Sequence, residues 1–502
     1  MTDASTPRTR TRAFLRGSLL VGLVLGAGLA LYLPYLDLFI FTEARQYVHY
    51  RGGVEDLVRH LGTFLVPVGW NNRPASMLAF RAMHGGCGYD WRCLNAVQIG
   101  LVLAAAVLLL CHGAQVLRSQ ALAAALALVW LASLPVLDAV TWQATSHDKL
   151  AAVFTLGVLV LLHWACAAPH SRRVVTGAST VLAVLTAIAL NAKESAFFLP
   201  LLLPLAAVLW GVPRKREGLL QAALVVLPAT AFSAYYVALY LIRLDASWAA
   251  HVLSAGSTWN VRVLGAYLNA ALQPAAWHAA AFLAAGGALA LVLRRHARGA
   301  GSVLSALARP EVQATLYFAC FFAGAALLAV KTRFPGPYYM YIPGIGWYGL
   351  LAALGQALGR ERHAVLRGVG VLAIGLLCVD LVASVRHQTS DATRHARLLA
   401  ASRRLSRKLP ALRERLPPDP GLVYTLVVPQ DVKCFFHFLR SGSGDIDPTL
   451  LNFLYGTDGD YSVRQIAPRR FRRSAIESHE RVLVLDGTCA IEAAFEGRRR
   501  VL

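Results

Sequence analysis

Long apolar runs recur along most of this chain, and they constrain its fold more than any other feature. About 20 apolar residues cross the hydrocarbon core of a bilayer as a helix, because backbone polar groups in lipid must be satisfied within the segment itself. We therefore expect an α-helical polytopic membrane protein with about 11 transmembrane helices. The runs fall near residues 14–33, 95–112, 119–137, 149–167, 174–190, 195–212, 219–242, 275–293, 312–330, 342–358 and 364–384.

Basic residues predict the orientation of these spans, because Lys and Arg in short loops resist translocation. The N-terminal segment is basic, and so is every second connection after it, at Arg118, Arg172–Arg173, Arg214–Arg216, Arg294–Arg298 and Arg360–Arg362. The sequence therefore predicts a cytoplasmic N-terminus and, with an odd number of spans, a C-terminal domain in the periplasm of a bacterial inner (plasma) membrane protein. The first run is long and lacks a small-residue cleavage site, so we expect no cleavable signal peptide here.

The formal net charge of +22 raises the question of nucleic-acid binding. Much of this excess lies in the loops assigned to the cytoplasm, where orientation explains it. No module that combines basic and aromatic residues for nucleic acid is visible. We therefore expect no nucleic-acid partner.

The first outer loop, residues 34–94, is too polar to span a bilayer and too aromatic to be a simple linker. It carries an apolar stripe at helical spacing, which predicts a helix lying in the membrane interface, at Val54, Leu57, Val58, Leu61 and Phe64. Cys87 and Cys93 share this loop, and Cys434 and Cys489 share the C-terminal part. Paired cysteines in an oxidising compartment predict two disulfides.

The composition changes after the last span, so we divide the chain into a transmembrane part, 1–385, and a C-terminal part, 386–502. A basic amphipathic helix is expected over 386–416, before Pro417 and Pro418. Strands are expected at 421–429, at 461–467 and in a pair that turns at Asp486-Gly487, with short helices near 432–439 and 450–455. The sequence thus predicts a small extracytoplasmic α/β domain.

Ionisable residues collect near the outer ends of the spans, where charge is costly unless it is paired or hydrated. Five connections contribute them, namely Asp37, Glu43 and Arg73; His147, Asp148 and Lys149; Lys193 and Glu194; Arg243 and Asp245; and Lys331 and Arg333. Adjacent opposite charges at 148–149 and 193–194 could simply neutralise each other. Their shared sidedness instead predicts a functional site on the outer face.

Five short motifs follow one another between residues 36 and 346: LDLFIF, WNNRPAS, VTWQATSHDKL, AKESAFFLP and PYYMYIPGIG. In this order they resemble the GT-C superfamily of integral-membrane glycosyltransferases. The resemblance is to the protein O-mannosyltransferase-like groups, including the tetratricopeptide-containing transmembrane group. The chain departs from the family pattern at Leu36, Ser146 and Tyr338, where charged residues are expected.

The resemblance implies a hexosyl- or pentosyltransferase that uses a polyprenyl-phosphate sugar as donor. The acceptor would be an envelope glycan, lipid or protein. Asp37 would be the general base, with inversion at the anomeric carbon, and Asp148 the second catalytic acid. Donor phosphate would be bound by four cations, namely Arg73, Lys149, Lys193 and Arg333. Support would come from His147, Glu194, Tyr338 and Tyr341. No cofactor or metal is required by these residues, although Asp37 with Asp148 could hold a divalent cation weakly.

Three other functions are compatible with a polytopic membrane chain. An O-antigen ligase or polymerase would place its large outer loop late in the chain, whereas here the loop follows the first span. A lipid or solute transporter would favour paired repeats or broken helices, and neither is visible in the sequence. A structural or assembly role would leave the clustered charges unexplained.

Overall fold

The computed structural model describes most of the chain. The residues described are 7–39, 62–67, 73–142, 145–211, 215–243, 286–287, 290, 294, 309–330, 337–390, 393–427, 449–455, 462–466, 471–485 and 491–501. Outside these residues lie positions 54–61 of the predicted interfacial helix, the Cys434–Cys489 pair, the helix at 432–439 and nearly all of the span at 275–293.

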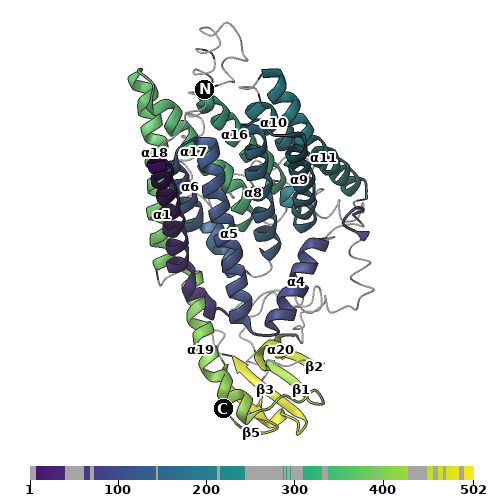
Figure 1. The fold of residues 1–502 in the computed structure, drawn as a ribbon. Coiled ribbons are helices and arrows are strands. Elements are labelled where there is room, and N and C mark those ends of the chain that lie inside the picture. Colours follow the sequence, from purple (N-terminus) through teal and green to yellow (C-terminus); the bar gives the residue numbers. More distant parts are fainter. Residues whose placement is uncertain are drawn as a thin grey trace.

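A bundle of long apolar helices makes up the transmembrane part (Figure 1). Its helices are α1 (Pro7–Tyr32), α4 (Pro74–Cys87), α5 (Trp91–Leu117), α6 (Gln120–Ala132), α7 (Leu134–Thr141), α8 (Ser146–Ala167), α9 (Arg172–Ala192), α10 (Leu199–Gly211), α11 (Lys215–Ile242), α16 (Pro310–Val330), α17 (Tyr341–Gly359) and α18 (Ala364–Thr389). Short 3₁₀ helices lie at η1 (Leu33–Asp37), η3 (Glu194–Ala196) and η5 (Pro337–Met340).

Within the described residues, seven of the helical segments are long and apolar enough to cross a membrane, or eight if one bent pair forms a single span. Their outward faces carry large apolar side chains such as Leu201, Leu227 and Val382, each more than 60% exposed. In an aqueous protein such surfaces would drive association, whereas in lipid they are the stable outer face. The chain is therefore an integral membrane protein. The count of eleven spans stays a prediction.

The span expected at 119–137 is divided in two, because α6 and α7 meet at a bend of 49°. Ser133 adopts an extended conformation between them, and Pro135 follows in the first turn of α7. Proline lacks the N–H that would continue the helical hydrogen bonds and favours a helix start. The bend points α7 toward Trp142 and the start of α8.

The C-terminal part is a five-stranded mixed sheet with the order β2-β1-β3-β4-β5. Its strands are β1 (Val423–Val427), β2 (Ser462–Ile466), β3 (Glu480–Leu485), β4 (Ile491–Glu496) and β5 (Arg499–Arg500). Strand β1 is parallel to both β2 and β3, and β4 runs antiparallel to β3 and β5. Helices α19 (Arg394–Arg415) and α20 (Thr449–Tyr455) accompany the sheet. The strands confirm the predicted α/β character.

The predicted helix at 386–416 is two helices, because α18 continues to Thr389 and α19 starts only after Thr393. The Thr393 hydroxyl accepts a hydrogen bond from the Ala396 N–H at 3.1 Å, which caps the new helix. Figure 1 shows α19 leading from the bundle to the sheet, which lies at the end of the bundle opposite the start of α1.

The C-terminal domain and the first outer loop share one hydrophobic core. Phe80 of α4 and Leu94 of α5 belong to the same buried cluster as Leu409 of α19 and Leu483 of β3. Tyr89, in the turn between α4 and α5, packs edge-on against Phe453 of α20 with the ring centroids 5.2 Å apart. The two regions therefore form a continuous packing unit outside the bundle.

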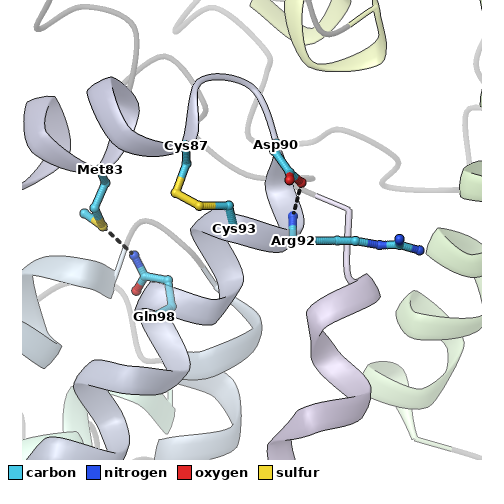
Figure 2. The surroundings of a disulfide bond; sticks show 6 residues. All are labelled: Met83, Cys87, Asp90, Arg92, Cys93 and Gln98. Atoms are coloured by element: carbon cyan, nitrogen blue, oxygen red, sulfur yellow. Dashed lines mark hydrogen bonds between the residues drawn. A yellow bond between two sulfur atoms is a disulfide. The ribbon is translucent and has the colours of Figure 1, made fainter.

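A disulfide between Cys87 and Cys93 closes the turn between α4 and α5, as predicted (Figure 2). Inside this turn, the Asp90 side chain accepts a hydrogen bond from the Arg92 N–H at 2.9 Å and caps α5. Figure 2 shows the Arg92 side chain directed away from the disulfide. The covalent link and the cap together fix the angle at which α4 meets α5.

Replacing both Cys87 and Cys93 by Ser should lower the stability of the outer loop by about 2 kcal/mol, because the disulfide restricts a short loop in the unfolded chain. The melting temperature of the purified protein in detergent measures this loss. Cys378→Ser, at an exposed free cysteine of α18, is the control and should melt like wild type. Equal melting of all three proteins would contradict the stabilising role.

A second prediction concerns Glu480, which is buried at the start of β3 and bonded to Thr425 and Arg464. Burial raises the Glu480 pKa, but these hydrogen bonds outweigh it and leave the pKa below its ordinary value. Its contribution to stability is therefore present above the unfolded pKa of about 4.3 and is lost as the pH falls through the folded pKa.

Glu480→Gln should accelerate hydrogen exchange in β1 and β3 at pH 7, and the difference from wild type should shrink below about pH 4. Glu492→Gln, on an exposed position of β4, is the matched control. A difference that stays constant with pH would show that the carboxylate charge is not involved.

Candidate functional site

Arg73 and Glu194 form a largely buried ion pair with three short contacts. The Arg73 Nε lies 3.1 Å from each Glu194 oxygen, and Nη2 lies 2.8 Å from Oε2. Arg73 directly precedes α4, which starts at Pro74, and both side chains are largely buried, at 12% and 16% exposure. Burial lowers the Arg73 pKa, but the adjacent carboxylate outweighs this and raises it. The pair ties the outer loop to the bundle.

Glu194 is positioned by the break between α9 and α10. Lys193 is extended there, with φ −161° and ψ 146°, and Glu194 begins the one-turn helix η3. Tyr240, near the end of α11, donates a hydrogen bond from its hydroxyl to Glu194 Oε1 at 3.1 Å. The Glu194 carboxylate is therefore held by Arg73, which precedes α4, and by Tyr240 of α11.

Further hydrogen bonds beside this pair position the segment that leads to Arg73. Asn191 of α9 donates to the Phe64 carbonyl oxygen at 3.1 Å and receives a hydrogen bond from the Tyr236 hydroxyl at 2.9 Å. Arg243, at the end of α11, donates to the Pro67 carbonyl oxygen at 3.3 Å. Tyr236, Tyr240 and Arg243 share one face of α11. Arg243 therefore contacts the outer loop directly, whereas Tyr236 and Tyr240 hold Asn191 and Glu194, which contact it in turn.

Lys193 and Asp148 form a second, looser pair, with 3.6 Å between Lys193 Nζ and Asp148 Oδ2. Asp148 lies in the first turn of α8 and is 4% exposed. Ser195 donates to Asp148 Oδ1 at 3.3 Å, and Oδ2 has no hydrogen-bond partner among the described residues. Lys193 and Glu194 thus pair with different partners rather than with each other.

Lys149 is fully buried and turned toward α5, where its Nζ donates to Gln98 Oε1 at 2.7 Å. The Gln98 amide in turn bonds to Ser146. The His147 ring packs edge-on against Phe80 of α4 with the centroids 5.2 Å apart. The first turn of α8 is therefore linked to α4 and to α5.

Asp37 lies at the end of η1 and pairs with Arg92 at 3.0 Å, with side-chain exposures of 37% and 61%. Asn95, one turn further along α5, donates to the carbonyl oxygens of Leu36 and Leu38 on either side of Asp37. In the described residues no hydrogen bond or ion pair joins Asp37 to Asp148, Arg73 or Glu194. Asp37 therefore occupies a more exposed position than the buried pairs.

Tyr341 begins α17, and its ring lies 5.0 Å from that of Trp130, whose indole N–H donates to the Tyr341 carbonyl oxygen at 2.9 Å. Its hydroxyl is buried and has no hydrogen-bond partner in the described part of the chain. Tyr338 lies in η5, and its side chain is outside the described set. Arg333 also lies outside it.

The structure adds several residues that the sequence analysis did not select, namely Arg92, Asn95, Gln98, Ser195 and Tyr240. A signal existed for two of them, because Asn95 and Gln98 are polar residues within an otherwise apolar span. Ser195 follows the selected pair directly. Across the described ranges, no group of three or more His, Cys, Asp or Glu side chains is arranged to hold a metal ion.

Breaking the buried pair should be costly, because Arg73 cannot lose its charge. Glu194→Gln should destabilise the protein by about 3 kcal/mol, measured by thermal unfolding in detergent. Glu311→Gln is the matched control. Glu311 pairs with Arg360 at 2.8 Å, but the Arg360 side chain is 66% exposed. This substitution should lower the stability by less than about 1 kcal/mol. Equal effects of the two substitutions would contradict the importance of burial.

Comparisons with known proteins give matches among solved structures only. No protein-family model matches, and no curated protein matches. Among solved structures, the oligosaccharyltransferase of Archaeoglobus fulgidus, tethered with an acceptor peptide, is similar with a TM-score of 0.41 and 10% sequence identity. The match covers 89% of this chain and 64% of the archaeal chain. The chain thus spans less than two thirds of that protein.

Proposed function

We propose that the protein is a membrane glycosyltransferase of the GT-C type, which transfers a sugar from a polyprenyl-phosphate donor to an acceptor on the extracytoplasmic side. One observation carries the proposal: two buried ion pairs, Arg73–Glu194 and Lys193–Asp148, meet where α4 and α8 begin and α9 ends. Charged groups at the end of a membrane bundle are expensive. Binding and release of an anionic substrate would explain why these charged side chains lie at the end of the bundle.

The chemistry needs a carboxylate and a set of cations. The acceptor oxygen bonds to the anomeric carbon, while the bond from that carbon to the phosphate oxygen breaks and its electron pair leaves with the phosphate. Asp37 acts as general base and takes the proton of the acceptor hydroxyl. The configuration at the anomeric carbon inverts. Arg73, Lys193 and Arg333 stabilise the departing phosphate.

We assign supporting roles to the remaining predicted residues. Lys149 adds positive potential from the same turn as Asp148 while its Nζ stays bonded to Gln98. Glu194 keeps Arg73 in place, and His147, Tyr338 and Tyr341 support the site. Asp148 orients the acceptor. The donor tail lies in the membrane lipid beside the bundle, and the acceptor is an envelope glycan, a lipid or a protein.

Comparison of a deletion strain with its parent tests the class and the substrate together. We expect the deletion strain to accumulate a polyprenyl-phosphate sugar and to lack one sugar residue of an envelope glycan, lipid or protein. Mass spectrometry of extracted lipids and of purified envelope polymers measures both. Unchanged lipid-linked sugars together with an unchanged envelope would reject the proposal.

Asp37→Asn should abolish sugar transfer, because the acceptor would have no base, and should leave folding and donor binding nearly intact. Transfer by the purified variant, measured with lipid extract as donor source, checks this. Glu217→Gln, at the start of α11, is the control and should retain activity. Full activity of the Asn variant would remove Asp37 from the mechanism.

A further inference from the structure

The two ion pairs of the site differ in geometry. Arg73 makes three contacts of 2.8–3.1 Å with Glu194, using Nε and Nη2. In the second pair, Lys193 Nζ lies 3.6 Å from Asp148 Oδ2, beyond ordinary hydrogen-bond length. Because Lys is a flexible point charge whereas Arg is fixed by its planar geometry, the Lys193–Asp148 pair is the one that can open.

Arg73 does not need to leave Glu194 to bind an anion. A guanidinium carries five N–H donors, and those on Nη1 take no part in the bonds to Glu194. The Nη1 donors of a fixed Arg73 therefore remain for an incoming phosphate. For Lys193, by contrast, an incoming phosphate has to compete with a carboxylate.

The competitor is Asp148, whose carboxylate is poorly satisfied for a buried group. It accepts one hydrogen bond of 3.3 Å, from Ser195, and its Oδ2 accepts none in the described structure. Buried polar atoms normally have a partner, and a buried carboxylate without one is strongly disfavoured. Asp148 therefore has an open position for a hydrogen-bond donor that the resting protein does not supply.

A second unpartnered group lies nearby. The Tyr341 hydroxyl is buried without a hydrogen-bond partner among the described residues, and it is close enough to Asp148 to interact with it electrostatically. Tyr341 comes from α17 and Asp148 from α8, so two distant parts of the chain each present an unused polar atom. A ligand with hydroxyl groups can satisfy both.

We propose that the Lys193–Asp148 pair is exchanged when substrate binds, so that donor phosphate takes Lys193 and the released Asp148 accepts a hydrogen bond from the acceptor beside its reacting oxygen. This rests on the proposed function and deepens it. The acceptor carries a second hydrogen-bond donor next to the reacting hydroxyl, as sugars do.

Binding of polyprenyl phosphate to the purified full-length protein in detergent tests the exchange. Asp148→Asn removes the competitor for Lys193, so it should bind this lipid about threefold to tenfold more tightly than wild type. Lys193→Gln should bind it more weakly. In the Lys193→Gln background, Asp148→Asn should give no gain, because the cation for which the two anions compete is absent.

Asp90→Asn is the charge control, since it removes one negative charge from the first outer loop at a residue whose capping of α5 an Asn can keep, and it should leave the affinity unchanged. A gain in both Asn variants, or a gain that persists without Lys193, would overturn the exchange and leave only a general charge effect. Unchanged or weaker binding by Asp148→Asn would also overturn it.

If Asp148→Asn does not fold, Ser195→Ala provides the second test. Loss of the Ser195 hydrogen bond leaves Asp148 more dependent on Lys193, so the exchange predicts weaker lipid binding, whereas unchanged binding would overturn it. Failure of wild type to bind polyprenyl phosphate at all would reject the proposed function itself, which distinguishes that failure from failure of the exchange alone.

Discussion

The guanidinium of Arg73 imposes the constraint on which the outer end of the bundle depends. Arg stays charged in a protein interior, so a largely buried Arg must have an anion beside it. Glu194 provides that anion from the break after α9, and Tyr240 holds the carboxylate from α11. Three elements distant in the sequence are thereby fixed to one another, and the start of α4 acquires a defined position.

Much of the fold could be predicted from the pattern of residues. Apolar runs indicated the helices, because lipid leaves few other choices, and short segments of strand-forming residues bounded by turn residues indicated β1 to β4. The bend after Ala132 was missed because hydropathy averages over a window and does not register one extended residue. Ser133 followed by Pro135 was the available signal. The division at Thr389 was missed because α19 continues the same basic, Leu-rich composition.

The site shows a sharper limit. Sidedness predicted that Arg73, Asp148, Lys193 and Glu194 would share a face, and these four residues form the two pairs that meet there. Their pairing could not be predicted, because Lys193 and Glu194 are neighbours in sequence and could have neutralised each other. The extended backbone at Lys193 sends each toward a different partner. The backbone conformation, rather than the order of the charged residues in the sequence, determines which ion pairs form.

The shared core of the first outer loop and the C-terminal domain has a consequence for biosynthesis. Phe80 and Leu94 are made early, whereas Leu409 and Leu483, which complete their packing, are made last. A nascent chain that has inserted all its spans still exposes these early apolar side chains to water. Quality control should therefore detect chains that end after α18, because their loop surface stays uncovered, even though every membrane helix is in place.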